Sequence, residues 1–222
     1  EKDHKRNINE YLDNKLEQIF HFDQKYEKVF ELMKAFTFLS AGVIQFNKLP
    51  RIMGENIGNA ELFDAQEKLI DFNNDENKIG ISFLKENGIC DDKFICLHVR
   101  NSDYDEMINR AEQCNTLYDR TASAQKRNSF RNISPKNLIP TIEYLINSNY
   151  SVIRMGKGYK EKFPFSHPKF IDYAVSNYRN DFLDIWLFAN CFFCITPGTG
   201  IDEISRIFKR PSICINHLPI LD

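Results

Sequence analysis

The sequence lacks any hydrophobic run long enough to cross a lipid bilayer. Its longest apolar stretch, Ile185–Ile195, is short and is interrupted by Asn190, whereas a membrane-spanning helix needs about 20 apolar residues. An excess of charge of one sign is also missing, because 29 Lys and Arg residues are balanced by 31 Asp and Glu residues. We therefore expect no integral membrane segment and no surface for nucleic acid. We expect a cytoplasmic location, in which association with a membrane surface stays open.

Motifs for metals and dinucleotide cofactors are missing as well. Cys191 and Cys194 form a single CxxC pair, and a structural zinc site needs two more ligands. No Gly-x-Gly-x-x-Gly follows the first expected strand, as it does in dinucleotide-binding folds. Most of the six cysteines lie in apolar segments, which is typical of small buried side chains in a reducing compartment. We expect neither a metal nor a cofactor.

The first part of the chain, residues 1–88, is expected to be mostly helical. Apolar residues at helical spacing over 8–33 predict a long amphipathic helix. Its apolar face could pack on the rest of the chain, on a missing domain or on a second subunit. Another helix is predicted over 74–87, with Gly88 as its stop signal. The chain begins at Glu1 rather than at methionine, which favours a fragment of a longer protein.

Residues 89–222 alternate between apolar runs and helical patterns. Strands are expected at 94–98, 150–155, 170–174, 191–195 and 212–215, and helices at 181–188, at 201–208 and after Ser134. Pro140 either kinks the helix that starts near Ser134 or marks its true first turn. This alternation predicts an α/β fold with a Rossmann-like parallel sheet and right-handed crossovers.

A histidine and an arginine stand together at the end of the first expected strand. His98 and Arg100 are two residues apart, so they point to the same side of an extended chain. Open α/β sheets bind ligands at this edge, and an arginine there suits an anion such as a diphosphate. The alternative is a salt bridge at the strand end with a solvated arginine. Asp103 follows, either as a general base for an acceptor hydroxyl or as a partner that orients Arg100.

Other candidate residues lie near the second and third expected strands. Arg154 and Lys157 come at the end of the second strand, and Arg131 lies in a long polar segment before it. Their charges suit the same anion. Asp172 and Tyr173, near the end of the third strand, could meet a base or a ribose. Equally, Asp172 could cap the next segment and Tyr173 could belong to the core.

A turn rich in hydroxyl groups and glycine follows the fourth expected strand. It contains Thr196, Gly198, Thr199 and Gly200 and leads into a helix. Such a turn exposes backbone N–H groups to an anion. The alternative is an ordinary connection in which Thr199 caps the helix.

The residues His98, Arg100 and Asp103 resemble the first motif of the fucosyltransferase-like glycosyltransferases of the GT-B type. The similarity covers about residues 75–217 and includes segments 131–132, 152–157, 172–174, 181–184 and 196–200. Together these segments are similar to a bacterial group of glycosyltransferases associated with surface-polysaccharide genes. Asn101 and Ser102 follow Arg100 where fucosyltransferases commonly have a second arginine and then Gly and Asp. The resemblance therefore leaves the donor's base and sugar open.

The resemblance implies a role for each matching residue. Arg100 would contact the diphosphate of a nucleotide-sugar donor, and His98 would lie near the nucleotide. Asp172 would read the base. The turn residues Thr196, Thr199 and Gly200 would touch the diphosphate, and arginine charge would replace a metal at the leaving group.

These roles imply a function for the whole chain. Residues 89–222 would form the donor-binding half of the enzyme, and residues 1–88 a reduced or truncated acceptor half. We expect a metal-independent glycosyltransferase that moves a sugar from a nucleotide diphosphate to a glycan or related acceptor in surface-polysaccharide synthesis. The alternative is a non-catalytic module that binds a nucleotide or nucleotide sugar within a larger assembly. Oligomerisation through the N-terminal helix stays open.

Overall fold

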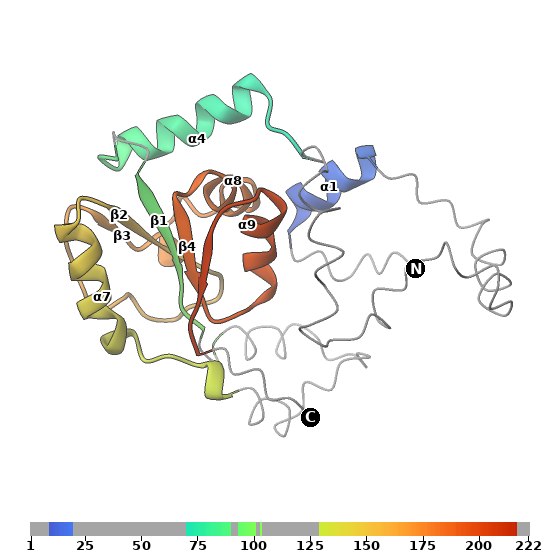
Figure 1. The fold of residues 1–222 in the computed structure, drawn as a ribbon. Coiled ribbons are helices and arrows are strands. Elements are labelled where there is room, and N and C mark those ends of the chain that lie inside the picture. The colour runs from blue at the N-terminus through green and yellow to red at the C-terminus, as the bar shows by residue number, and fades with distance from the viewer. Residues whose placement is uncertain (1–8, 20–69, 90–92, 101–102, 104–128, 217–222) are drawn as a thin grey trace, which may run out of the picture. The chain divides into compact units, whose positions relative to one another are not determined.

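The computed structural model describes residues 9–19, 70–89, 93–100, 103 and 129–216 (Figure 1). The chain divides into two compact units, residues 1–71 and 72–222. In the first unit, α1 (Glu10–Ile19) begins after Asn9, whose Oδ1 accepts a hydrogen bond from the backbone N–H of Leu12 at 2.8 Å. This helix is part of the one expected over 8–33, and residues 20–33 lie outside the described part.

The second unit is built on a five-stranded parallel sheet. Its strands are β1 (Phe94–His98), β2 (Ser151–Met155), β3 (Phe170–Ile171), β4 (Phe193–Thr196) and β5 (Ser212–Cys214). They lie in the order β3-β2-β1-β4-β5, and each neighbouring pair is parallel. The expected α/β fold with a parallel sheet is confirmed. The strand order matches that of a doubly wound sheet, in which the chain leaves the central strand in both directions.

Helices cover both faces of this sheet. On one face α7 (Pro135–Asn147) packs on β2, and on the other lie α8 (Asp181–Asn190) and α9 (Glu203–Ile207) (Figure 1). α4 (Asn74–Glu86) packs on α8, where the indole N–H of Trp186 donates to Oδ1 of Asn77 at 3.1 Å. α4 lies in the same compact unit as the sheet.

The ends of the helices follow from local sequence. Asn73 caps α4, since its Oδ1 accepts from the N–H of Glu76 at 2.9 Å while the Glu76 carboxylate accepts from the N–H of Asn73 at 2.7 Å. Gly88 follows with a φ of +74°, in the left-handed region that favours glycine, and the predicted stop is confirmed. In α7, Pro135 lies in the first turn and Pro140 lies inside the helix. Pro140 therefore does not mark the start of α7.

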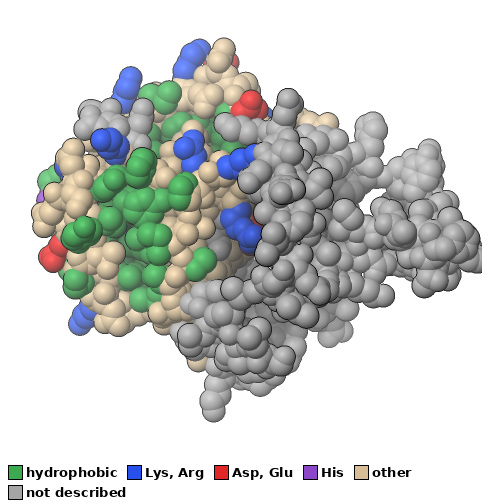
Figure 2. All heavy atoms as spheres, in the orientation of Figure 1, with side chains coloured by type: hydrophobic (Ala, Val, Ile, Leu, Met, Phe, Trp, Pro, Cys, Tyr) green, Lys and Arg blue, Asp and Glu red, His purple; other side chains and the backbone are tan. Residues whose placement is uncertain are grey.

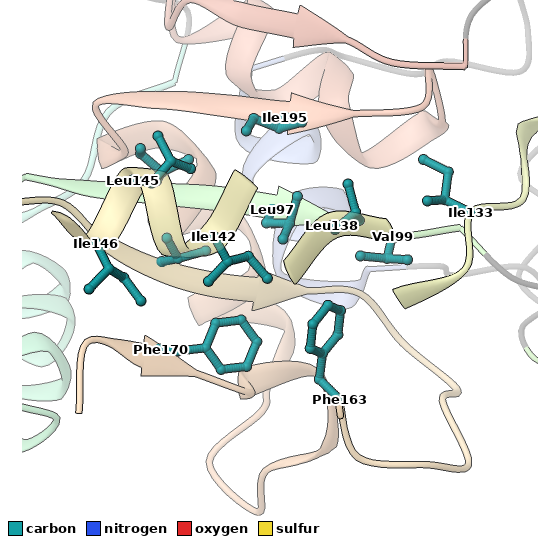
Figure 3. Packing of buried hydrophobic residues seen from close by; sticks show 12 residues of the cluster. Leu97, Val99, Ile133, Leu138, Ile142, Leu145, Ile146, Phe163, Phe170 and Ile195 are labelled. Carbon is teal, nitrogen blue, oxygen red and sulfur yellow. The ribbon is translucent and has the colours of Figure 1, made fainter. Parts of the chain in front are cut away.

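A large buried apolar cluster lies between α7 and the sheet. Leu97 of β1 lies in one buried cluster with Ile142 and Leu145 of α7 (Figure 3). Ile95 and Val152 belong to the same cluster. The strands β1 and β2 are buried on both faces, as expected for the centre of a parallel sheet with helices on both sides. Each buried aliphatic side chain contributes about 1.5–3 kcal/mol of transfer free energy. This rigid centre holds the strand ends that carry the candidate site.

Two elements differ most from the sequence prediction, and β4 starts at Phe193 rather than at Cys191. The third strand ends at Ile171 instead of Ala174, and Tyr173–Val175 form the short 3-10 helix η4. The chain turns there because the ring of Tyr173 packs edge-on against Phe83 of α4, with centroids 5.6 Å apart. The helix expected over 201–208 starts as the 3-10 helix η5 (Gly200–Asp202), and α9 has only five residues.

Cysteines and apolar side chains are not all buried. Cys96, Cys191 and Cys194 are buried as predicted, whereas Cys214 on the edge strand β5 is exposed.

Figure 2 shows a group of apolar side chains on the face of the sheet unit in view. None of the described helices combines the length and the apolar character that a bilayer crossing requires.

Candidate functional site

At the carboxyl end of β1, successive side chains point alternately into the core and towards the surface. Val99 is 1% exposed and belongs to the core cluster under α7. His98 and Arg100, on either side of it, are only partly buried. The alternation of side chains along an extended chain explains this arrangement. The two polar groups are therefore delivered together, as the sequence predicts.

The turn after β4 contacts this end of β1 directly. Oγ1 of Thr199 shares a hydrogen bond with Nδ1 of His98 at 3.0 Å. Thr199 precedes η5, but its hydroxyl makes no capping hydrogen bond there. Thr199 therefore stands at the N-cap position of η5 without capping it through its hydroxyl. Its hydroxyl instead connects the two central strands at their carboxyl ends.

The 3-10 helix before α7 also contacts the turn after β4. Arg131, the last residue of the 3-10 helix η3 (Ser129–Arg131), donates from Nη1 to the backbone oxygen of Gly198 at 2.8 Å. Gly198 has a φ of +72°, which a glycine adopts without strain. Thr196 is fully buried, and its Oγ1 has no hydrogen-bond partner among the described residues. The structure thus brings Arg131 and the turn 196–200 to the end of β1.

The electrostatic environment keeps His98 neutral at pH 7. Burial, followed by the positive charges of Arg100 and Arg154, lowers the pKa of His98 to about 4. A neutral imidazole has one nitrogen that donates and one that accepts, so it can bond to the Thr199 hydroxyl while its other nitrogen meets a ligand. The positive charge of the site comes from its arginines.

Arg154 and Asp172, which the sequence assigns to separate roles, are paired with each other. Nη1 of Arg154 donates to Oδ1 and Oδ2 of Asp172 at 3.0 and 3.2 Å, and the two side chains are 3% and 18% exposed. Oδ2 of Asp172 also accepts from the backbone N–H of Phe163 at 2.7 Å. This pair ties β2 to the residue that follows β3, and the hydrogen bond from Phe163 adds the loop before β3. Arg154 reaches the site through its charge, which contributes to the low pKa of His98.

Tyr173 lies inside the protein rather than at its surface. The side chain is 0% exposed, and its hydroxyl exchanges hydrogen bonds with the backbone N–H and oxygen of Asn180, both at 3.1 Å. This placement favours the core alternative for Tyr173, since no face of the ring is left for a ligand.

Asp103 and Lys157 remain near the surface. The side chain of Asp103 is 20% exposed, and its Oδ2 accepts from the backbone N–H of Lys160 at 3.2 Å. The Nζ of Lys160 lies 3.8 Å from Oδ1 of Asp103. Lys157, two residues past the end of β2, is partly buried. Asp103 thus links the segment after β1 to the loop after β2.

The sequence interpretation missed two residues at the end of β2. Arg179 donates from Nε to the backbone oxygen of Gly156 at 3.1 Å and from Nη2 to Asp184 at 2.5 Å. Burial raises the pKa of Asp184 to about 6, although Arg179 opposes the shift. The hydroxyl of Tyr159 donates a hydrogen bond to the backbone oxygen of Val99, just past the end of β1. Asp181 and Asp184, which follow Arg179 closely in the sequence, indicate its ion pairs. No local pattern marks Tyr159.

The described residues contain no group of three or more His, Cys, Asp or Glu side chains arranged to hold a metal ion. The site is therefore a set of arginine, histidine and threonine side chains with two glycines, gathered at the carboxyl ends of β1 and β4. No protein-family model, curated protein or solved structure matches this chain.

Proposed function

We propose that the carboxyl ends of β1 and β4 bind the diphosphate of a nucleotide sugar. The observation that carries the proposal is the hydrogen bond between His98 and Thr199 at 3.0 Å. It joins the arginine-bearing end of one strand to the glycine-containing turn after its neighbour. In a doubly wound sheet this is the switch point, where ligands bind outside the carboxyl ends of the strands.

The chemistry of the site suits a diphosphate. Arg100 supplies a charge that can grip two phosphate oxygens at once. Gly198 and Gly200 allow a ligand to approach the backbone of the turn closely, because neither has a side chain. The neutral His98 offers a hydrogen bond without adding charge. A mobile anion with several oxygens can use all three kinds of group together.

Residues 89–222 are then the donor-binding half of a metal-independent glycosyltransferase of the GT-B type, working on the cytoplasmic side in surface-polysaccharide synthesis. Arginine charge would stabilise the negative charge that develops on the departing nucleoside diphosphate. A hydroxyl of the glycan acceptor would attack the anomeric carbon of the sugar, with Asp103 as the candidate base. The resemblance of His98, Arg100 and Asp103 to the first fucosyltransferase-like motif supports this interpretation.

The test is binding of UDP, GDP, ADP and CDP, measured by titration calorimetry on wild-type protein and on Arg100→Ala. We expect one of the four to bind, and we expect Arg100→Ala to weaken it at least about tenfold, because a charge-assisted contact is lost. The matched control is Arg206→Ala, since Arg206 forms an exposed pair with Glu203 on α9. Absence of binding, or equal binding by Arg100→Ala, would contradict the proposal.

A second measurement distinguishes the transferase from the non-catalytic binding module. The nucleotide sugar that corresponds to the bound diphosphate is incubated with the protein, and its hydrolysis is followed by release of free nucleoside diphosphate. Release that depends on Arg100 supports the transferase. Binding without release supports the non-catalytic module.

A further inference from the structure

The loop after β2 contacts the backbone of the His98-Val99-Arg100 segment. The hydroxyl of Tyr159 donates a hydrogen bond to the backbone oxygen of Val99, the residue between the histidine and the arginine. Next to it, the backbone N–H of Lys160 donates to Oδ2 of Asp103 at 3.2 Å. Two consecutive loop residues therefore bond to the segment that carries the candidate site.

The ring of Tyr159 is fixed by its surroundings. The guanidinium carbon of Arg154 lies 3.9 Å from the ring centroid, a cation–π arrangement. Arg154 is itself held by the Asp172 carboxylate. The ring also lies against Gly156, where an added Cβ would come within 2.5 Å of a ring carbon. Only glycine leaves room for the ring there, and its φ of +131° is one that other residues rarely adopt.

These contacts form a continuous path that runs from the end of β3, through β2 and the β2–β3 loop, to the site. Asp172 holds Arg154, Arg154 stacks on Tyr159, and Tyr159 bonds to the carbonyl of Val99. The orientation of that carbonyl fixes the peptide unit between Val99 and Arg100, because the peptide group is planar. It therefore sets the direction in which Arg100 leaves the strand.

We infer that Tyr159 is a positioning residue, whose hydroxyl orients Arg100 beside His98 for the anionic ligand by holding the carbonyl of Val99. The inference rests on the proposed function for its ligand, and it adds a residue outside the motif that carries the resemblance. The hydroxyl stays protonated at neutral pH, because burial raises the pKa of Tyr159. It therefore remains a donor under all conditions in which the site would work.

The first test is Tyr159→Phe, which keeps the ring over Arg154 and removes only the hydroxyl. Titration of His98 is followed by NMR from pH 3.5 to 8, with its signal identified by comparison with His98→Asn. We expect the pKa of His98 to rise from about 4 towards 6.5, since a loosened strand end admits water to the imidazole. The control is Tyr144→Phe on α7, whose side chain is 71% exposed, and it should titrate as the wild type does.

The second readout is affinity for the nucleoside diphosphate that the wild-type protein binds. Tyr159→Phe should weaken it about five- to tenfold, the effect expected for loss of one orienting hydrogen bond, while Tyr144→Phe leaves it unchanged. Gly156→Ala should also weaken binding, because its added Cβ would displace the ring of Tyr159. Gly88→Ala is its control, because Gly88 also has a positive φ but no atom lies within 4 Å of an added Cβ.

The outcomes separate this inference from the proposed function. If the wild-type protein binds no nucleoside diphosphate, the proposed function fails, and the titration of His98 alone decides the role of Tyr159. An unchanged His98 titration in Tyr159→Phe overturns the inference. An unchanged affinity overturns it as well where the wild-type protein does bind.

Discussion

Nδ1 of His98 and Oγ1 of Thr199 lie 3.0 Å apart, although 101 residues separate them along the chain. They meet because β1 and β4 are neighbours in the sheet without being consecutive in the sequence. The strand order thus converts two unremarkable polar residues into the centre of a candidate site. It also brings the end of β1, which carries Arg100, to the same edge of the sheet as the turn 196–200.

His98 should make the stability of the protein depend on pH. Its pKa is lowered to about 4 in the folded state from an ordinary value of 6.5. Between these pH values the unfolded chain binds a proton at His98 that the folded chain does not. The contribution of neutral His98 to stability is therefore fully present above pH 6.5 and is lost as the pH falls towards 4. Lowering the pH from 7.5 to 5 should therefore reduce the free energy of unfolding of the wild type by about 1–2 kcal/mol more than that of His98→Asn.

The measurement is urea unfolding at several pH values on both proteins. His167→Asn provides the control, since His167 is exposed and lies in the loop before β3; it should follow the wild-type curve. Parallel curves for wild type and His98→Asn would show that His98 is protonated alike in both states.

Asp172→Asn should destabilise the protein strongly. It leaves the guanidinium of Arg154 buried without a countercharge, in a place where that side chain is 3% exposed. We expect a loss of roughly 2–4 kcal/mol in the free energy of unfolding, as for other buried pairs that lose one partner. Circular dichroism during urea unfolding measures it.

The matched control uses the same substitution in an exposed pair. Asp75 lies 2.8 Å from Nζ of Lys78 on α4, and the two side chains are 85% and 75% exposed. Asp75→Asn should change stability by less than about 1 kcal/mol, because solvent screens such a pair. Equal effects at the two positions would mean that burial does not strengthen the pair of Arg154 and Asp172.

Gly80→Ala should destabilise the contact between α4 and α8. An added Cβ would lie 2.2 Å from ring atoms of Trp186, and overpacking of this kind costs about 1–3 kcal/mol. The loss should appear although alanine favours a helix by about 1 kcal/mol over glycine. Trp186 is the only tryptophan, so its fluorescence during thermal unfolding reports this interface directly. Ser82→Ala, at an exposed position of α4, should not lower the melting temperature.

Much of the fold can be read from local sequence. The apolar run that ends at His98 predicts β1, because a strand buried on both faces needs apolar side chains on both. Gly88 marks the end of α4 through left-handed backbone geometry. The prediction was less accurate after Ile171, where packing of Tyr173 against Phe83 ends the strand early.

The sequence by itself determined the alternation of strands and helices, and with it the delivery of His98 and Arg100 to a strand end. These features depend on side-chain periodicity and on residues a few positions apart. Only the tertiary structure decided that His98 meets Thr199, that Arg154 holds Asp172 and that Tyr159 bonds to Val99. Such pairs depend on the order of the strands and on the paths of their loops, which no local pattern encodes.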